Sequence, residues 1–197
     1  MRRMLALFAA ATLALALAAP AAATRGQAAH AVPFQMQTAG LDRPLEMAPG
    51  VPPDLDRSTF GGRCSQPSDW VTTIDSTGVA RHLGAVSVLN SHCTQFDFRS
   101  APPMPGTFED GRMTVTAANG DELWVEYSGS FLFWPGDRPD AGTSEIVMDQ
   151  MTIVGGTGRF VHASGSLHGT ALDEFGTGAD NGEFSGWILY SASDRAG

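Results

Sequence analysis

The sequence predicts an all-β domain, either a sandwich or a barrel, and three observations lead to this prediction. From Arg57 onward, short segments rich in Val, Thr, Phe and Trp alternate between apolar and polar residues. Gly, Asn, Asp and Pro interrupt these segments about every ten residues, which is the spacing of strands and turns in all-β domains. After the N-terminal apolar segment, no window has the 3.6-residue apolar period of an amphipathic helix.

Residues 1–23 have the form of a secretory signal peptide. Two arginines precede an Ala/Leu-rich apolar core that runs to about Ala19, and the small residues 21–23 suit cleavage before Thr24. The apolar core is too short and too rich in alanine for a good membrane span. We therefore expect a secreted or periplasmic protein that has no association with a membrane after the signal peptide is cleaved.

Residues 24–56 are predicted to form a flexible leader rich in Pro and Ala. Five prolines interrupt this stretch, and neither a helical nor an alternating period extends across it. The β domain itself is expected to span residues 57–193.

Cys64 and Cys93 are the two cysteines of the chain. Export places them in an oxidising compartment, where a disulfide between them is the default expectation. Such a bridge would close a loop of about 30 residues and stabilise the fold by roughly 3–4 kcal/mol. The alternative, a metal or redox site, lacks a C-x-x-C spacing.

The charge of the chain argues against a nucleic-acid partner. The sequence contains no lysine, and its formal net charge is −9 at pH 7. Loss of the two arginines in the signal peptide would leave the mature chain near −11. Nucleic acids and anionic lipids both bind to clustered cations, and this composition does not supply them.

The clearest predicted hairpin spans residues 111–134. Asn119–Gly120 lies between two alternating runs and suits a two-residue type I′ turn, which would pair Arg112 with Tyr127. One face of the hairpin carries more of the large apolar side chains, and we expect this face to line the interior of the domain. Its members would be Leu123, Val125, Tyr127, Phe131 and Phe133, joined by Arg112, Thr114 and Thr116.

Arg112 and Tyr127 are the best candidates for chemistry in that interior. An arginine can hold a carboxylate in a pocket of low dielectric, and a tyrosine can donate a hydrogen bond or a proton. The alternative places both side chains at a rim, with their polar ends in water. If the two faces of the hairpin are reversed, Glu126 points inward instead and becomes the candidate general acid or base.

The segment Ile153–Phe160 reads IVGGTGRF and suggests either a phosphate-binding loop or a tight turn. In a Walker-type phosphate loop, Lys and then Ser or Thr follow the glycine run, whereas this chain has Arg159 and Phe160 there. In the dinucleotide-binding pattern G-x-G-x-x-G, the third glycine would fall at Val161. A helix must also follow such a loop, whereas the residues after Phe160 alternate as a strand does. A tight turn between two strands is therefore the better interpretation.

IVGGTGRFVHASG resembles the GGTG-[KR]-F…A-x-G segment of plant dirigent proteins and the GG-[ST]-G-x-F segment of allene oxide cyclases. GRMTVTAANGDELWVEYSG is similar to the preceding hairpin in bacterial secreted proteins of that superfamily. The resemblance implies an all-β fold, a closed antiparallel β-barrel of about eight strands with an apolar cavity, commonly assembled as a trimer. It implies a structural role for Gly155, Gly156, Gly158 and Phe160, and it transfers no catalytic residue.

Histidines and acidic residues offer weaker candidates for a metal site. His162 and His168 are expected on one strand, roughly 20 Å apart, which is too far to share a metal. His82 and His92 lie in successive segments and lack a third ligand. The stretch Asp173–Glu183 lacks the spacing of an EF-hand, and we expect a solvated loop there. The sequence therefore predicts no metal and no other cofactor.

These features favour a non-catalytic protein that binds or scaffolds an apolar small molecule in its cavity. The alternative is a cyclase or isomerase that shapes a hydrophobic substrate in an apolar pocket, as the resemblance implies. The outward face of the hairpin is expected to expose a large apolar patch, which predicts a homo-oligomer, a trimer or a dimer. The residues of this patch would be Met113, Val115, Trp124, Leu132 and Trp134.

Overall fold

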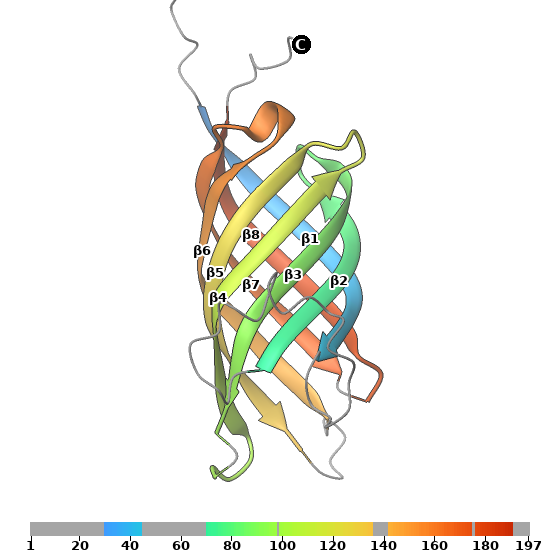
Figure 1. Cartoon of the computed structure of the whole chain (residues 1–197), viewed down its shortest axis with the longest axis vertical. Helices are drawn as coiled ribbons and strands as arrows, with labels where there is room; N and C mark the ends of the chain where they lie inside the picture. The colour runs from blue at the N-terminus through green and yellow to red at the C-terminus, as the bar shows by residue number, and fades with distance from the viewer. Residues whose placement is uncertain (1–29, 45–69, 98, 136–141, 175, 191–197) are drawn as a thin grey trace, which may run out of the picture.

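The computed structural model describes residues 30–44, 70–97, 99–135, 142–174 and 176–190, which form eight strands and one short 3-10 turn (Figure 1). Neighbouring strands pair antiparallel in chain order, and the first strand pairs with the last, so the sheet closes. The predicted closed antiparallel β-barrel of eight strands is confirmed. The described part of the chain contains no helix that is long and apolar enough to cross a membrane. The elements are β1 (His30–Pro44), β2 (Trp70–Ala80), β3 (Gly84–Phe96), β4 (Met104–Ala117), β5 (Glu122–Trp134), β6 (Thr143–Gly156), η1 (Gly158–Phe160), β7 (Ser164–Glu174) and β8 (Ala179–Tyr190).

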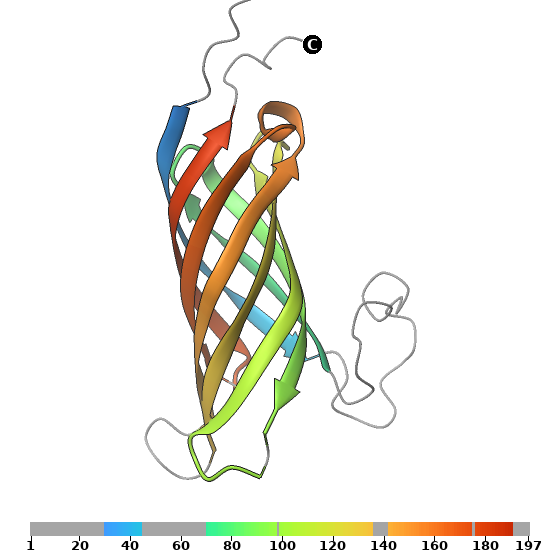
Figure 2. The same ribbon diagram turned by 90° about the vertical axis from the view of Figure 1, so that its left-hand side faces the viewer.

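The register of the strands sets the width of the barrel. A path through paired residues that starts at Phe96 and crosses every strand returns to β3 at Val86, ten residues away. This offset requires the strands to tilt, and Figure 2 shows the tilt along the length of the barrel. An eight-stranded barrel has an interior that side chains can fill or that can hold one small ligand.

The interior is apolar at the end where β1 begins, β8 ends and η1 lies, which is the upper end in Figure 1. Phe34, Leu123, Phe160 and Ile188 are completely buried and belong to one contiguous core. Their removal from water supplies the main driving force for closing the barrel. The opposite end, called the lower end below, has a more polar interior.

The first strand corrects the predicted domain boundary. β1 lies within residues 24–56, which we expected to form a flexible leader, yet it pairs with both β2 and β8. Phe34 and Met36 alternate inward with outward glutamines. Two prolines in the same strand, Pro33 and Pro44, hide this alternation in the sequence because proline normally marks a break in a sheet. The signal peptide and the rest of the leader lie outside the described residues.

Cys93 lies buried in β3, and the described part of the chain contains no free cysteine. Cys64, the predicted partner of Cys93, lies outside the described residues. The Cys64–Cys93 bridge therefore stays a prediction.

The turn between β4 and β5 differs from the predicted type I′ turn. The Ala117 N–H donates to the carbonyl of Asp121, and the Gly120 N–H donates to the carbonyl of Ala117, each at 2.9 Å. Gly120 has a φ angle of 86°. These features define a three-residue loop in which a type I turn is followed by a left-handed glycine. The two-residue turn was wrong, and the register of the hairpin shifts by one residue.

This shift reverses the predicted face of β4 and leaves that of β5 unchanged. Tyr127 and its apolar neighbours on β5 face inward as expected, but their inward partners on β4 are Met113 and Val115. Arg112 is exposed on the outer face, where it lies opposite Glu126 in the strand register. The outward patch predicted for this hairpin therefore does not form as expected.

The IVGGTGRF segment forms the corner between β6 and β7. Gly155 and Gly158 have φ angles of 140° and 52°, which glycine adopts without a steric penalty. Thr157 anchors the corner to β5, because its N–H donates to the Glu122 carbonyl and its Oγ1 accepts from the Glu122 N–H, each at 2.9 Å. Phe160 reaches the core and is 0% exposed. The three-residue η1 stands where a phosphate-binding loop would require a helix.

Candidate functional site

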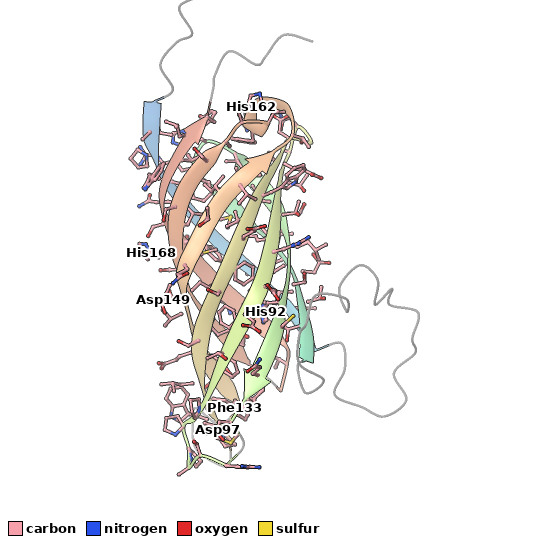
Figure 3. The ribbon with its side chains drawn as sticks, turned by 60° about the vertical axis from the view of Figure 1, so that its left-hand side comes forward. His92, Asp97, Phe133, Asp149, His162 and His168 are labelled. Atoms are coloured by element: carbon pink, nitrogen blue, oxygen red, sulfur yellow. The ribbon has the colours of Figure 1, made fainter. Side chains whose placement is uncertain are left out.

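A buried histidine and a buried tyrosine meet in the lower half of the barrel. The Nδ1 atom of His92 lies 2.9 Å from the Tyr127 hydroxyl oxygen. The His92 ring also lies against Phe108, with ring centroids 4.7 Å apart. Figure 3 shows His92 within the outline of the barrel, whereas His168 lies at its outer edge. His92, Tyr127 and Phe108 therefore form one polar–aromatic cluster inside the fold.

Irregularities in the strands direct one of these side chains inward. β3 shifts register between Ser91 and Cys93, and the adjoining strand β4 shifts between Phe108 and Gly111. A β-bulge places an extra residue on one strand and re-aims the side chains around it. In both shifts the extra residue lies on β4, so Phe108 joins the inward face of that strand, whereas His92 continues the regular inward alternation of Val88 and Asn90 on β3.

Glycines on neighbouring strands provide the surface on which the inward aromatic rings lie. A Cβ atom at Gly111 would collide with the Tyr127 ring, and one at Gly129 would collide with the Phe108 ring. The same relationship holds between other strands of the barrel. The further pairs are Gly106 with Phe131 and Gly169 with Phe184. Flat aromatic faces therefore line the interior.

Asp173 on β7 and Asp180 on β8 form a second buried polar group. The two residues lie directly opposite each other in the register and are 5% and 4% exposed. Burial raises the pKa of Asp180, and a hydrogen bond between its side chain and that of Asp173 opposes the shift. Two carboxyl groups can form a hydrogen bond only when a proton lies between them. Asp173 and Asp180 therefore form one buried acidic pair within the barrel.

In the part of the chain that the structure describes, buried oxygen atoms of Ser76, Asn90 and Ser144 have no hydrogen-bond partner. Ser144 lies opposite Asp173 in the register, and Gly40 connects Asp180 to Ser76. One row of inward positions thus runs across β6, β7, β8, β1 and β2. We call its four polar members the polar arc: Ser144, Asp173, Asp180 and Ser76.

The structure separates the three cavity candidates predicted from the sequence. Tyr127 faces the interior, but Arg112 and Glu126 lie on the outer wall. There they line a groove of about 510 Å³ together with Gln150 and Thr152, and Tyr127 also borders this groove. The shifted register of the hairpin explains the error, because one residue of shift moves a side chain to the opposite face of a strand. His92, which the sequence did not associate with Tyr127, takes the place expected for Arg112.

The remaining histidines lie apart from one another. His82 is in the turn between β2 and β3, where its Nε2 atom lies 3.1 Å from the Pro33 carbonyl oxygen. His162 precedes β7, so the prediction that it shares a strand with His168 was wrong. His168 lies on the outer wall, with its Nε2 atom 3.0 Å from Ser185 Oγ. No three His, Cys, Asp or Glu side chains of the described residues gather closely enough to hold a metal ion.

The acidic residues of the polar arc were expected in a solvated loop. They lie instead on the inward faces of β7 and β8, on either side of the turn at residues 176–178. The sequence does carry a signal for the burial of Asp173. This residue continues the two-residue spacing of Leu167, Gly169 and Ala171 along β7. The acidic character of the stretch concealed this pattern, since buried aspartates are rare.

Comparison with known proteins finds no protein-family model that matches the chain and no matching curated protein. The structure defines the class of fold, a closed eight-stranded antiparallel barrel, and the interior defines the candidate site. That site combines aromatic faces, a His92–Tyr127 pair and the polar arc.

Proposed function

We propose that this protein is an exported β-barrel that binds an apolar small molecule in the lower half of its interior. The observation that carries the proposal is the set of buried oxygen atoms on Ser76, Asn90 and Ser144 that lack a hydrogen-bond partner. Buried polar atoms in native proteins are almost always hydrogen-bonded. A ligand or ordered water that brings its own polar groups would complete these bonds. An apolar body with a few polar groups is typical of molecules held in protein cavities.

The surroundings of these atoms support an apolar body for the ligand. The rings of Phe108, Tyr127 and Phe184 line the interior, and each lies against a glycine of an adjoining strand. Flat aromatic faces bind hydrocarbon and ring systems through burial of apolar surface. The completely buried side chains Phe34, Leu123, Phe160 and Ile188 occupy the upper end, so the proposed ligand lies below them.

We also propose that the chain is related to the allene oxide cyclase and dirigent superfamily, as a secreted bacterial branch. Two features support this relationship. The barrel has the expected number of strands, and the GGTG segment forms a corner with Phe160 buried beneath it. Function still depends on the interior residues, because one fold hosts many activities.

A cyclase or isomerase acting on a hydrophobic substrate is the second candidate function, and the His92–Tyr127 contact favours it. A phenol can donate a proton and an imidazole can accept one, so the pair has the composition of a general acid and base. A substrate held against Phe108 would lie beside both groups. In this case a recovered ligand should change chemically on incubation with the protein, and Tyr127→Phe should abolish the change while retaining binding.

The binding proposal is tested first with a neutral lipophilic dye, N-phenyl-1-naphthylamine, and with native mass spectrometry of the mature protein. We expect a saturable rise in dye fluorescence and a bound mass on the protein purified from a secreting host. Ser76→Leu fills the interior, and Ser87→Leu makes the same change on the outer face. The inner variant should weaken dye binding by about tenfold or more, a loss of about 1.4 kcal/mol or more.

Circular dichroism and thermal unfolding establish that both leucine variants are folded. Absence of dye uptake by the parent protein would refute interior binding. Equal weakening by the inner and outer variants would refute it as well, because binding would then occur elsewhere.

We propose further that the barrel self-associates. Leu132 and Leu172 lie on either side of Glu145 in the register, and Val147 follows two residues along β6. The three apolar side chains are exposed on the outer wall, and grouped exposed apolar residues often mark an interface. Light scattering at micromolar concentration should report a mass above that of one chain. A monomer at all concentrations would contradict this proposal.

A further inference from the structure

We propose that the outer wall of the barrel carries a catalytic site that hydrolyses small carboxylic esters, with Ser185 as the nucleophile and His168 as its general base. This site is separate from the interior and does not depend on the proposed function. The two residues lie directly opposite each other on β8 and β7, and the His168 Nε2 atom lies 3.0 Å from the Ser185 Oγ atom. A nucleophile and a base at hydrogen-bond distance are the first requirement for covalent catalysis.

An acidic side chain lies on the far side of the base. β6 has a bulge in which Asp149 and Gln150 both lie opposite His168, and both are exposed on the outer wall. Figure 3 shows Asp149 next to His168 at the outer edge of the barrel. When the Nε2 atom accepts a proton from Ser185, the Nδ1 atom carries the other proton and can donate it in a hydrogen bond to the Asp149 carboxylate. A carboxylate in this place orients the imidazole and stabilises its charged form, so Asp149 is the positioning residue of the site.

Hydrogen-bond donors lie on the other side of the nucleophile. Gln35 on β1 lies directly opposite Ser185. The Arg81 N–H donates to the Gln35 carbonyl at 2.7 Å, which makes Arg81 the next residue of the same row. Both side chains are exposed, and their N–H groups can turn toward a molecule that is bound at Ser185. Such donors stabilise the negative oxygen that forms when a carbonyl carbon is attacked.

A groove gives the ester a place to bind. It has a volume of about 700 Å³, which is typical of sites for small molecules. Its walls include Gln35, Arg81, His168 and Ser185. Val79, which is 67% exposed, also lines the groove and offers an apolar surface to a short acyl chain. The acid, the base, the nucleophile and the donors thus follow one another across five neighbouring strands, and all but the acid border the same groove.

The reaction needs no reactant besides the ester and water. The Ser185 Oγ atom bonds to the carbonyl carbon, and its proton passes to the His168 Nε2 atom. The bond between that carbon and the alcohol oxygen then breaks, and His168 returns the proton to the departing alcohol. Water attacks the acyl-serine next, and one of its protons passes through His168 to the Ser185 oxygen as the carboxylic acid leaves. One ester and one water therefore yield one acid and one alcohol.

Steady-state hydrolysis of 4-nitrophenyl acetate by the mature protein tests the proposal. Ser185→Ala and His168→Gln should each lower kcat by about tenfold or more. Ser166→Ala is the matched control, because Ser166 is exposed on the outer face of β7 two residues from His168. His162→Gln controls for hydrolysis by an exposed imidazole alone. Both control variants should keep the kcat of the parent protein.

The role of Asp149 has its own measurement. Asp149→Asn should lower kcat by several-fold and leave KM unchanged, because the carboxylate acts on the imidazole and does not touch the ester. Asp149→Glu retains the carboxylate and should restore most of the rate. Equal losses of kcat in the two variants would overturn the positioning role of Asp149.

Labelling of the unmodified protein identifies the nucleophile directly. With an alkyl fluorophosphonate, a bond forms between the Ser185 oxygen and phosphorus, the phosphorus–fluorine bond breaks, and fluoride leaves while His168 takes the serine proton. Mass spectrometry of the peptides should find the phosphonyl group on Ser185, and His168→Gln should lose the label. This measurement holds even where a variant fails to fold, which circular dichroism reveals.

Three results would overturn the catalytic site. They are full activity of a folded Ser185→Ala variant, equal losses of kcat in Ser185→Ala and Ser166→Ala, and a parent protein in which the phosphonyl group is absent from Ser185.

Discussion

The Nδ1 atom of His92 and the hydroxyl oxygen of Tyr127 lie 2.9 Å apart inside the barrel, on strands separated by β4. The contact crosses an intervening strand at the level where the paired strands shift register. It therefore joins the imidazole and the phenol of the aromatic cluster across β4, the strand that carries the extra residue. Its contribution to stability can be measured directly.

Replacement of Tyr127 by phenylalanine should lower the free energy of unfolding by about 1–3 kcal/mol, because the buried Nδ1 atom of His92 loses this partner. Urea denaturation of both proteins measures the difference. Tyr190→Phe is the matched control at the upper end and should change stability by less than about 0.5 kcal/mol. Equal effects of the two substitutions would show that the His92–Tyr127 bond contributes nothing specific.

Ser144→Ala should stabilise the unliganded protein by about 1 kcal/mol, because it removes a buried hydroxyl that has no partner. The same change at Ser166, which is exposed on the outer wall, should be close to neutral. Chemical denaturation in the absence of ligand measures both. A clear loss of stability in Ser144→Ala would mean that the hydroxyl is satisfied within the protein.

Asp180→Asn should alter how stability depends on pH. Burial raises the pKa of Asp180 above 3.8, so near and above that pH the folded protein binds more protons than the unfolded chain. The contribution of this group is therefore fully present below about pH 3.8 and is lost as the pH rises through the raised pKa. The variant should gain most relative to the parent near neutral pH. An equal difference in melting temperature at pH 4 and pH 8 would contradict this expectation.

The double variant Arg112→Ala, Glu126→Ala should retain stability within about 0.5 kcal/mol, because both side chains are exposed and surface substitutions change stability little. Its affinity for N-phenyl-1-naphthylamine should equal that of the parent, since both residues lie on the outer wall. Fluorescence titration measures the affinity for the dye, and urea denaturation measures the free energy of unfolding. Loss of dye binding in the double variant would place the ligand in the outer groove instead of the interior.

The fold could be predicted from the sequence because its strongest signals are local. Leu123, Val125 and Tyr127 alternate cleanly, and β5 has the expected inward face. The face of β4 could not be obtained in the same way, because a glycine such as Gly120 serves both two-residue and three-residue turns. A single residue of register then decided whether Arg112 or Met113 entered the core.

The candidate site was harder to predict because it depends on contacts between distant segments. His92 meets Tyr127 across 35 residues, and the register of β3, β4 and β5, which leaves little trace in composition, brings them together over Gly111. Asp173 and Asp180 were interpreted as solvated because aspartate is normally exposed. Their burial can be predicted only if the alternation of inward and outward residues continues to the end of β7 and from the start of β8.

The most direct test of interior binding uses the histidine side chains as reporters in a carbon–proton NMR spectrum recorded during titration with N-phenyl-1-naphthylamine. His92 lies inside the barrel, whereas His82, His162 and His168 are exposed on its surface. Binding in the lower half should shift the His92 ring signals progressively to saturation and leave the His168 signals in place, because the dye ring would lie beside the imidazole. A saturating shift at His168 with His92 unchanged would place the ligand on the outer wall and contradict the proposed function.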